Sequence, residues 1–210
     1  MPPQPTTAPP PVASPTSGGP ATPPRIGPVG SPVPFPTPPQ AVLTTVATMS
    51  VRPSPTPVSV PANDPAIEQS TVAFPSGSVT VIAYLAKPKG AGPFRVALVC
   101  HENRGLTEYI KDVTRRFAKA GYVALAVDLL SQQGGTDKVR DPAQVPGVLG
   151  NTPPEQFVAY FQAAIAYLQA QAYVAKERIA MTGFCFGGGI TWRVITKTPQ
   201  IKAAVPFYGP

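Results

Sequence analysis

The sequence predicts an α/β fold, with a mainly parallel sheet covered by helices on both faces, behind a tail that lacks a core. Two β-rich runs open the folded part, and strand-length apolar runs then alternate with helical repeats, as in βα units. One of these runs enters a cysteine flanked by glycines, as at a sharp turn between a strand and a helix. Of the 31 prolines, 20 lie within residues 1–61.

The composition divides the chain at about residue 66. Residues 1–66 are rich in Pro, Ser and Thr, with almost no aromatic residues. Such a segment buries too little apolar surface to offset its backbone entropy. We therefore expect residues 1–66 to be a disordered tail with polyproline II bias, and residues 67–210 to form one domain.

The charge pattern argues against two classes of protein. The net charge is +7, but the basic residues are scattered and their longest run is Arg115-Arg116, so we expect a solvated face and no nucleic acid partner. No apolar run reaches the roughly 18–20 residues that a membrane-spanning helix needs. The two cysteines fit reduced thiols better than a disulfide framework.

The first elements of the domain are strands. Thr71–Phe74 and Val79–Leu85 are β-rich and are separated by the turn sequence of residues 75–78, which predicts a hairpin. Arg95–Cys100 is a continuous apolar run, typical of a strand covered on both faces. The loop His101–Gly105 follows it.

Helical and strand patterns alternate from there on. Apolar residues recur at helical spacing from Leu106 to Ala120, and Gly121 ends that helix. A buried strand is expected at Tyr122–Val127, with Asp128 at its carboxyl end, and a polar loop to about residue 151. The sequence of residues 152–155 (Thr-Pro-Pro-Glu) predicts a capping box before the next helix. Three further elements are expected, namely a strand at 179–182, a helix at about 187–196 and a strand at 202–207.

Cys185 is the candidate nucleophile. It lies in the pattern Gly-x-Cys-x-Gly, and a strand-to-helix turn of this kind needs small residues at Gly183 and Gly187. The helix that follows favours the thiolate through its positive end. The backbone N–H of Phe186 is a candidate oxyanion-hole donor. The alternative is a glycine-rich junction around a buried, inert cysteine; dinucleotide and P-loop spacings are absent.

The loop after the third strand is expected to supply the second oxyanion donor, and the N–H of Asn103 is our candidate. Glu102 either faces the thiol and controls its protonation or is an ordinary solvated carboxylate. His101, the single histidine, is interpreted as shaping the loop rather than acting as the base. Arg104 binds a substrate carboxylate or faces water, the latter being favoured, and Cys100 is interpreted as structural.

The domain resembles the dienelactone hydrolase family of the α/β-hydrolase superfamily from about Val72 onward. The resemblance depends on residues 101–106 (His-Glu-Asn-Arg-Gly-Leu), on residues 118–129, and most specifically on residues 183–188 (Gly-Phe-Cys-Phe-Gly-Gly). It implies hydrolysis of a lactone or ester through Cys185, with Glu102 near the thiol and N–H donors at Asn103 and Phe186. It implies a small-molecule substrate and neither a metal nor an organic cofactor.

The resemblance also implies that the acid and the histidine lie after later strands, which this sequence lacks. We therefore expect an incomplete α/β-hydrolase fold, truncated at its C-terminal end, with little or no turnover. The rival hypothesis is a non-catalytic interaction protein that acts through its tail, in which Pro20–Arg25 loosely fits a P-x-x-P ligand. The compartment stays open, since reduced thiols favour the cytoplasm and the Pro/Ser/Thr-rich spacer is compatible with export. The sequence does not fix the oligomeric state.

Overall fold

The structure, a computed structural model, describes residues 59–209. The predictions for residues 1–58, which include the proline-rich tail, lie outside these residues. The packed region begins before the predicted boundary at residue 67. Val60 is 1% exposed, its N–H donates to Asp112 at 2.7 Å, and its carbonyl accepts from Arg115. The composition predicted that this segment belongs to the tail. In the structure, the side chains of Asp112 and Arg115, both in the first helix of the domain, form hydrogen bonds with its backbone.

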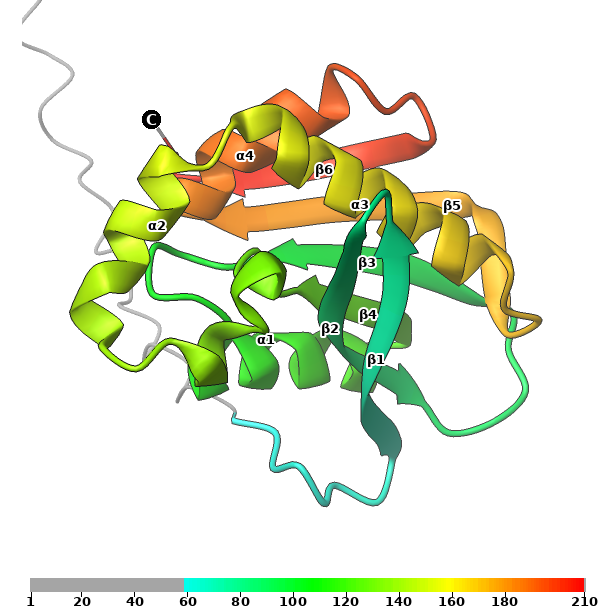
Figure 1. Cartoon of the computed structure of the whole chain (residues 1–210). Coiled ribbons are helices and arrows are strands. Elements are labelled where there is room, and N and C mark those ends of the chain that lie inside the picture. Colours follow the sequence, from blue (N-terminus) through cyan, green and yellow to red (C-terminus); the bar gives the residue numbers. More distant parts are fainter. Residues whose placement is uncertain (1–58, 210) are drawn as a thin grey trace, which may run out of the picture. The chain divides into compact units, whose positions relative to one another are not determined.

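Six strands form one mixed sheet in the order β1-β2-β4-β3-β5-β6, as Figure 1 shows. The pairs β1/β2 and β2/β4 are antiparallel, and β4, β3, β5 and β6 run parallel. This confirms the mainly parallel sheet behind an opening hairpin. The strands are β1 (Ile67–Ser76), β2 (Val79–Pro88), β3 (Phe94–Cys100), β4 (Tyr122–Val127), β5 (Val174–Phe184) and β6 (Ile201–Phe207).

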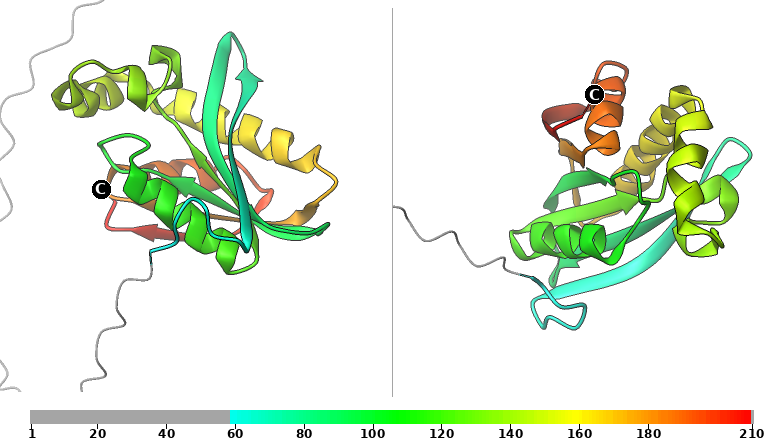
Figure 2. Two further views of the ribbon diagram at one scale, coloured as in Figure 1. Left: turned by 90° about the horizontal axis from the view of Figure 1, so that it is seen from below. Right: turned by 90° about the vertical axis from the view of Figure 1, so that its left-hand side faces the viewer.

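Helices cover both faces of the sheet (Figures 1 and 2). α1 (Glu108–Lys119) packs on one face, while α3 (Pro154–Gln169) and α4 (Phe186–Ile195) pack on the other. Alternate side chains of each strand feed the two cores, because successive residues point to opposite faces. Leu98 of β3 lies in the larger core with α3, and Val99 lies in the core with α1.

The segment after β4 is more ordered than predicted. It forms three short 3-10 helices, η2 (Ser131–Gln133), η3 (Thr136–Lys138) and η4 (Pro142–Gln144), and then α2 (Val145–Asn151). The sequence predicted a polar loop here because these short helices carry no local sequence signal. Tertiary contacts stabilise them instead, including those of the buried Leu149.

The predicted capping box is wrong. Thr152 Oγ1 donates to the carbonyl of Val148 at 2.8 Å, and α3 starts at Pro154 without a side-chain cap. Because α2 ends directly before it, the Thr152 hydroxyl completes that helix instead of opening the next one.

The connections of β3 place a topological switch point at its carboxyl end. The chain goes from β3 to β4 on one side of it, and then crosses to β5 on the other side. Ligands of open α/β sheets bind at such a switch point, beyond the carboxyl ends of the strands. Residues 101–105, Asp128 and Cys185 follow β3, β4 and β5 respectively, so the fold gathers all three at this edge.

Candidate active site

Cys185 occupies the turn between β5 and α4 in a strained conformation. Its φ of 52° and ψ of −121° are rare for a residue with a side chain. Three hydrogen bonds hold this backbone. The Cys185 N–H donates to the carbonyl of Phe207 (3.1 Å), and the Cys185 carbonyl accepts from the N–H groups of Gly188 (2.8 Å) and Gly189 (3.3 Å). The residue is partly exposed, in contrast to Cys100.

The glycines on either side of the turn are required by close backbone contacts. A Cβ at Gly183 would lie 2.1 Å from the carbonyl oxygen of Gly187 and 2.4 Å from Thr191 Oγ1. A Cβ at Gly187 would lie 2.4 Å from the carbonyl oxygen of His101 and 2.5 Å from that of Cys100. The second contact joins the cysteine turn directly to the loop after β3.

The first residue of α4 leaves its amide without a partner inside the helix. Phe186 is the first residue of α4, so its N–H has no acceptor within the helix. The positive end of the helix dipole lies at the same place. The Phe186 ring packs edge-on against Phe157 of α3, with 5.8 Å between centroids, and this contact anchors the turn to the core.

Glu102 has a partner that the sequence analysis missed. The Tyr208 hydroxyl donates to Glu102 Oε1 at 3.0 Å. This bond raises the pKa of Tyr208, because it stabilises the protonated phenol, and desolvation and the negative charge of Glu102 add to the effect. Tyr208 directly follows β6, and its place beyond the carboxyl end of a parallel strand was the signal that could have identified it.

His101 is fully buried, and both of its ring nitrogens are engaged. Nε2 lies 3.0 Å from the backbone N of Leu129, which donates to it, so Nε2 carries no proton. Nδ1 therefore carries the proton and donates to the carbonyl of Glu102 at 2.6 Å. Burial lowers the pKa of His101, which keeps the ring neutral. This agrees with the interpretation of His101 as a loop-shaping residue.

The far end of the same loop is tied to the segment after β4. Asp128 accepts from the N–H and the hydroxyl of Thr136, at 2.6 and 2.8 Å. Thr136 Oγ1 in turn accepts from the N–H of Leu106 at 2.8 Å. Gly105, at φ 82°, packs so tightly that a Cβ would lie 2.4 Å from Thr136 Oγ1. The loop is thus held at both ends.

The remaining candidate residues have plainer surroundings. Asn103 and Arg104 are exposed at the loop tip, and Arg104 forms no ion pair with any residue of 59–209. Cys100 is completely buried, which raises the pKa of its thiol. The structure therefore joins Glu102 to Tyr208, whose neighbour Phe207 accepts from the Cys185 N–H, and leaves Cys100 in the core.

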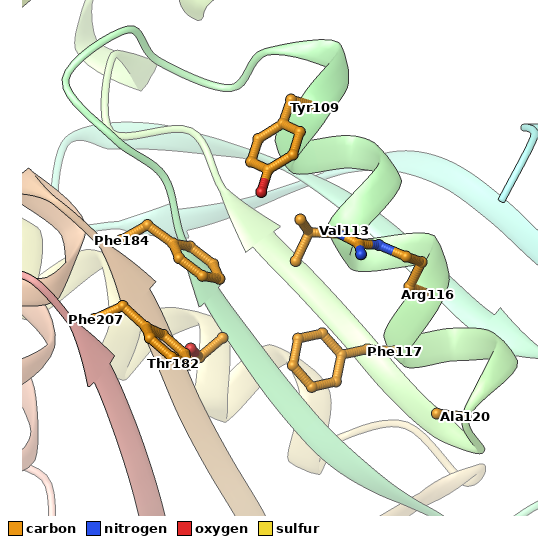
Figure 3. Close-up of a pocket in the computed structure, with 8 residues that line it drawn as sticks. All are labelled: Tyr109, Val113, Arg116, Phe117, Ala120, Thr182, Phe184 and Phe207. Carbon is orange, nitrogen blue, oxygen red and sulfur yellow. The ribbon is translucent and has the colours of Figure 1, made fainter. Parts of the chain in front are cut away.

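An apolar groove of about 470 Å³ lies between α1 and the neighbouring face of β5 and β6 (Figure 3). Phe184 and Phe207 stack in it with 5.2 Å between ring centroids, and Tyr109, Val113 and Phe117 of α1 face them. Phe207 is 44% exposed, and Val205 on the same strand is 55% exposed. None of the candidate catalytic residues lines this groove.

Residues 59–209 lack two structural features. No three His, Cys, Asp or Glu side chains in this part of the chain gather as a metal site would require. None of its helices has the length and apolar character needed to cross a bilayer.

Residues 81–210 match the sequence model described as "Dienelactone hydrolase family". A "Putative carboxymethylenebutenolidase" of Methylorubrum extorquens is 38% identical over 139 residues, which are 66% of this chain and 48% of that protein. Another of the same name from Escherichia coli is 35% identical over 148 residues, 70% of this chain and 54% of that protein. The chain spans about half the length of these relatives.

Solved structures agree with the sequence matches. A structure titled "Putative Dienelactone Hydrolase" from Klebsiella pneumoniae has a TM-score of 0.62 at 35% identity, with 69% of this chain and 60% of that chain covered. A "Dienelactone Hydrolase-like Promiscuous Phospotriesterase" from metagenomic libraries has a TM-score of 0.58 at 28% identity and the same coverage.

Proposed function

We propose, from the fact that this chain belongs to the dienelactone hydrolase family, that it is a hydrolase whose Cys185 attacks a carboxylic ester or lactone. One observation supports the assignment of the nucleophile above all. Cys185 holds a positive φ at the start of α4 and is partly exposed, whereas the other cysteine is buried in β3. Strain of this kind persists where the surrounding structure imposes it, and it clusters at active sites.

The reaction would proceed in two steps. The Cys185 thiolate attacks the carbonyl carbon, and the N–H groups of Phe186 and Asn103 stabilise the oxyanion of the tetrahedral intermediate. The intermediate collapses to a thioester as the C–O bond breaks, and the leaving alkoxide takes up a proton. In a lactone the new hydroxyl stays on the acyl group. Water then cleaves the thioester, which releases the carboxylic acid and restores the thiol.

Glu102 would control the protonation of the thiol. A carboxylate close to a thiol disfavours the thiolate by charge repulsion. The hydrogen bond from Tyr208 draws part of the carboxylate charge toward the phenol and stabilises one position of the Glu102 side chain. We therefore assign Tyr208 a role in setting how strongly Glu102 acts on Cys185.

The residues of this chain would give slow turnover. Acyl transfer to cysteine is normally assisted by a neighbouring base, most often histidine. The single histidine, His101, already uses both ring nitrogens in buried hydrogen bonds, so it is not free to take a proton from Cys185. We expect an acyl-enzyme to form and to be hydrolysed slowly.

Selective alkylation tests the nucleophile. At pH 7 iodoacetamide should modify Cys185 faster than a free cysteine and leave Cys100 unmodified until the protein unfolds. Mass spectrometry of tryptic peptides distinguishes the two sites. A Cys185→Ala variant should lose the fast reaction, and Cys100→Ala is its matched control. Equal labelling of both cysteines in the folded chain would contradict the proposal.

A further inference from the structure

The buried ring of His101 is hydrogen-bonded at both of its nitrogens. A completely buried, neutral histidine has two ring nitrogens to satisfy, and here one contacts the loop after β3 while the other contacts the loop after β4. The acceptor of Nδ1–H is the carbonyl of Glu102. That carbonyl belongs to the same peptide unit as the N–H of Asn103, the second proposed oxyanion donor.

Peptide geometry links the two groups. The peptide unit is planar and trans, so its C=O and N–H point in opposite directions. The His101 ring lies toward the β4 side, because Nε2 accepts from Leu129 just after β4. β5, which leads to Cys185, pairs with the opposite side of β3. A Glu102 carbonyl directed at the ring therefore directs the Asn103 N–H away from the ring and from the β4 side, on which Leu129 lies.

We propose that His101 is a positioning residue, whose ring fixes the Glu102–Asn103 peptide so that the Asn103 N–H can stabilise the oxyanion formed at Cys185. This inference rests on the proposed function and adds the origin of the second donor. The loop after β3 cannot shift as a whole, because Gly187 packs against the carbonyls of Cys100 and His101. The Glu102 carbonyl also accepts from the Gly105 N–H at 3.4 Å, and the shorter bond from Nδ1 (2.6 Å) is the stronger restraint on rotation of this peptide.

Two substitutions separate the two bonds of the ring. In His101→Asn the side-chain amide nitrogen takes the place of Nδ1, so the donor to Glu102 is kept and the acceptor for Leu129 is lost. In His101→Gln the longer side chain places an oxygen near the position of Nε2, so the acceptor for Leu129 is kept and the donor to Glu102 is lost. A merely structural histidine would not separate these variants by their effect on the oxyanion.

The readout is a ratio of two rates at Cys185. Acetylation by p-nitrophenyl acetate develops an oxyanion, whereas alkylation by iodoacetamide does not, so their ratio isolates the oxyanion hole from thiol ionisation. Loss of one donor costs about 100-fold or more in related chemistry. We expect the ratio to fall about 100-fold in His101→Gln and to recover most of that loss in His101→Asn. Phe161→Leu, a buried change in α3, controls for lost stability and should leave the ratio unchanged.

A second readout does not depend on catalysis. The ¹⁵N NMR signals of the His101 ring should show a neutral imidazole with its proton on Nδ1 at pH 6. A proton on Nε2 would overturn the proposal, and so would equal ratios in the two variants when the parent chain does form an acetyl adduct. A parent chain that forms no adduct on Cys185 would overturn the proposed function and the role of His101 together, so the two failures are distinguishable.

Discussion

Gly187→Ala is expected to disrupt the contact between the cysteine turn and the loop after β3. The new Cβ would lie 2.4 Å from the carbonyl oxygen of His101 and 2.5 Å from that of Cys100, whereas ordinary contact begins at 3.4 Å. Both neighbours are backbone atoms at the end of the central strand, so neither can turn away. The start of α4 and the loop must therefore separate by about 1 Å, the difference between contact and clash.

A separation of about 1 Å should lower both the stability of the domain and the rate of acetylation. An overpacked core position costs about 1–3 kcal/mol, which for a folded unit of this size lowers Tm by roughly 3–10 °C. A misplacement of about 1 Å between reacting groups costs about 10²-fold in rate. We therefore expect Gly187→Ala to remain folded at 20 °C and to lose about 100-fold in the rate of Cys185 acetylation.

The assay combines circular dichroism melting with stopped-flow release of p-nitrophenolate from p-nitrophenyl acetate. The matched control is Gly150→Ala in α2, where no atom lies within 4 Å of the new Cβ. That helical substitution should stabilise by up to about 1 kcal/mol and leave acetylation unchanged. If Gly187→Ala and Gly150→Ala acetylate at the same rate, the account of the site geometry is refuted.

Three further outcomes are expected. Burial lowers the pKa of His101, and this outweighs the opposite effect of Asp128 and Glu102, so the unfolded state takes up the proton first as pH falls below about 6.5. The free energy of unfolding of the parent should therefore fall toward pH 5, by up to about 1.4 kcal/mol per pH unit. In urea titrations this fall should be steeper for the parent than for His101→Asn. Tyr208→Phe should free the Glu102 carboxylate and slow alkylation of Cys185 by up to about fivefold; an unchanged rate would remove Tyr208 from the site. Val205→Lys, on the exposed edge strand β6, should reduce light scattering at high concentration and change the free energy of unfolding by less than about 0.5 kcal/mol; equal scattering would show that this edge does not drive association.

The sequence predicted the sheet and the cysteine turn because both have local signals. Continuous apolar runs marked β3 and β4, and the spacing of Gly183 and Gly187 around Cys185 marked a turn whose close contacts the structure then showed. The same holds for α1, whose apolar residues follow the helical period. These features depend on residues that are near one another in the chain.

The features that the sequence missed depend on contacts between distant residues. Tyr208 contacts Glu102 across 106 positions, and the two ring nitrogens of His101 are assigned only once Leu129 is seen beside it. The helical turns after β4 form around the Asp128 side chain, which no local pattern indicates. Thr152 likewise carried a capping signal that the preceding helix uses instead.

The most direct test of the account is the identity of the atom that receives the acyl group. The full chain, mixed with p-nitrophenyl acetate at pH 7 and quenched in acid within seconds, should carry one added acetyl group. Peptide mapping should locate that group on Cys185 as a thioester, which hydroxylamine removes. An acetyl group found on Cys100, on lysines alone or on no residue would contradict the claim that Cys185 is the nucleophile.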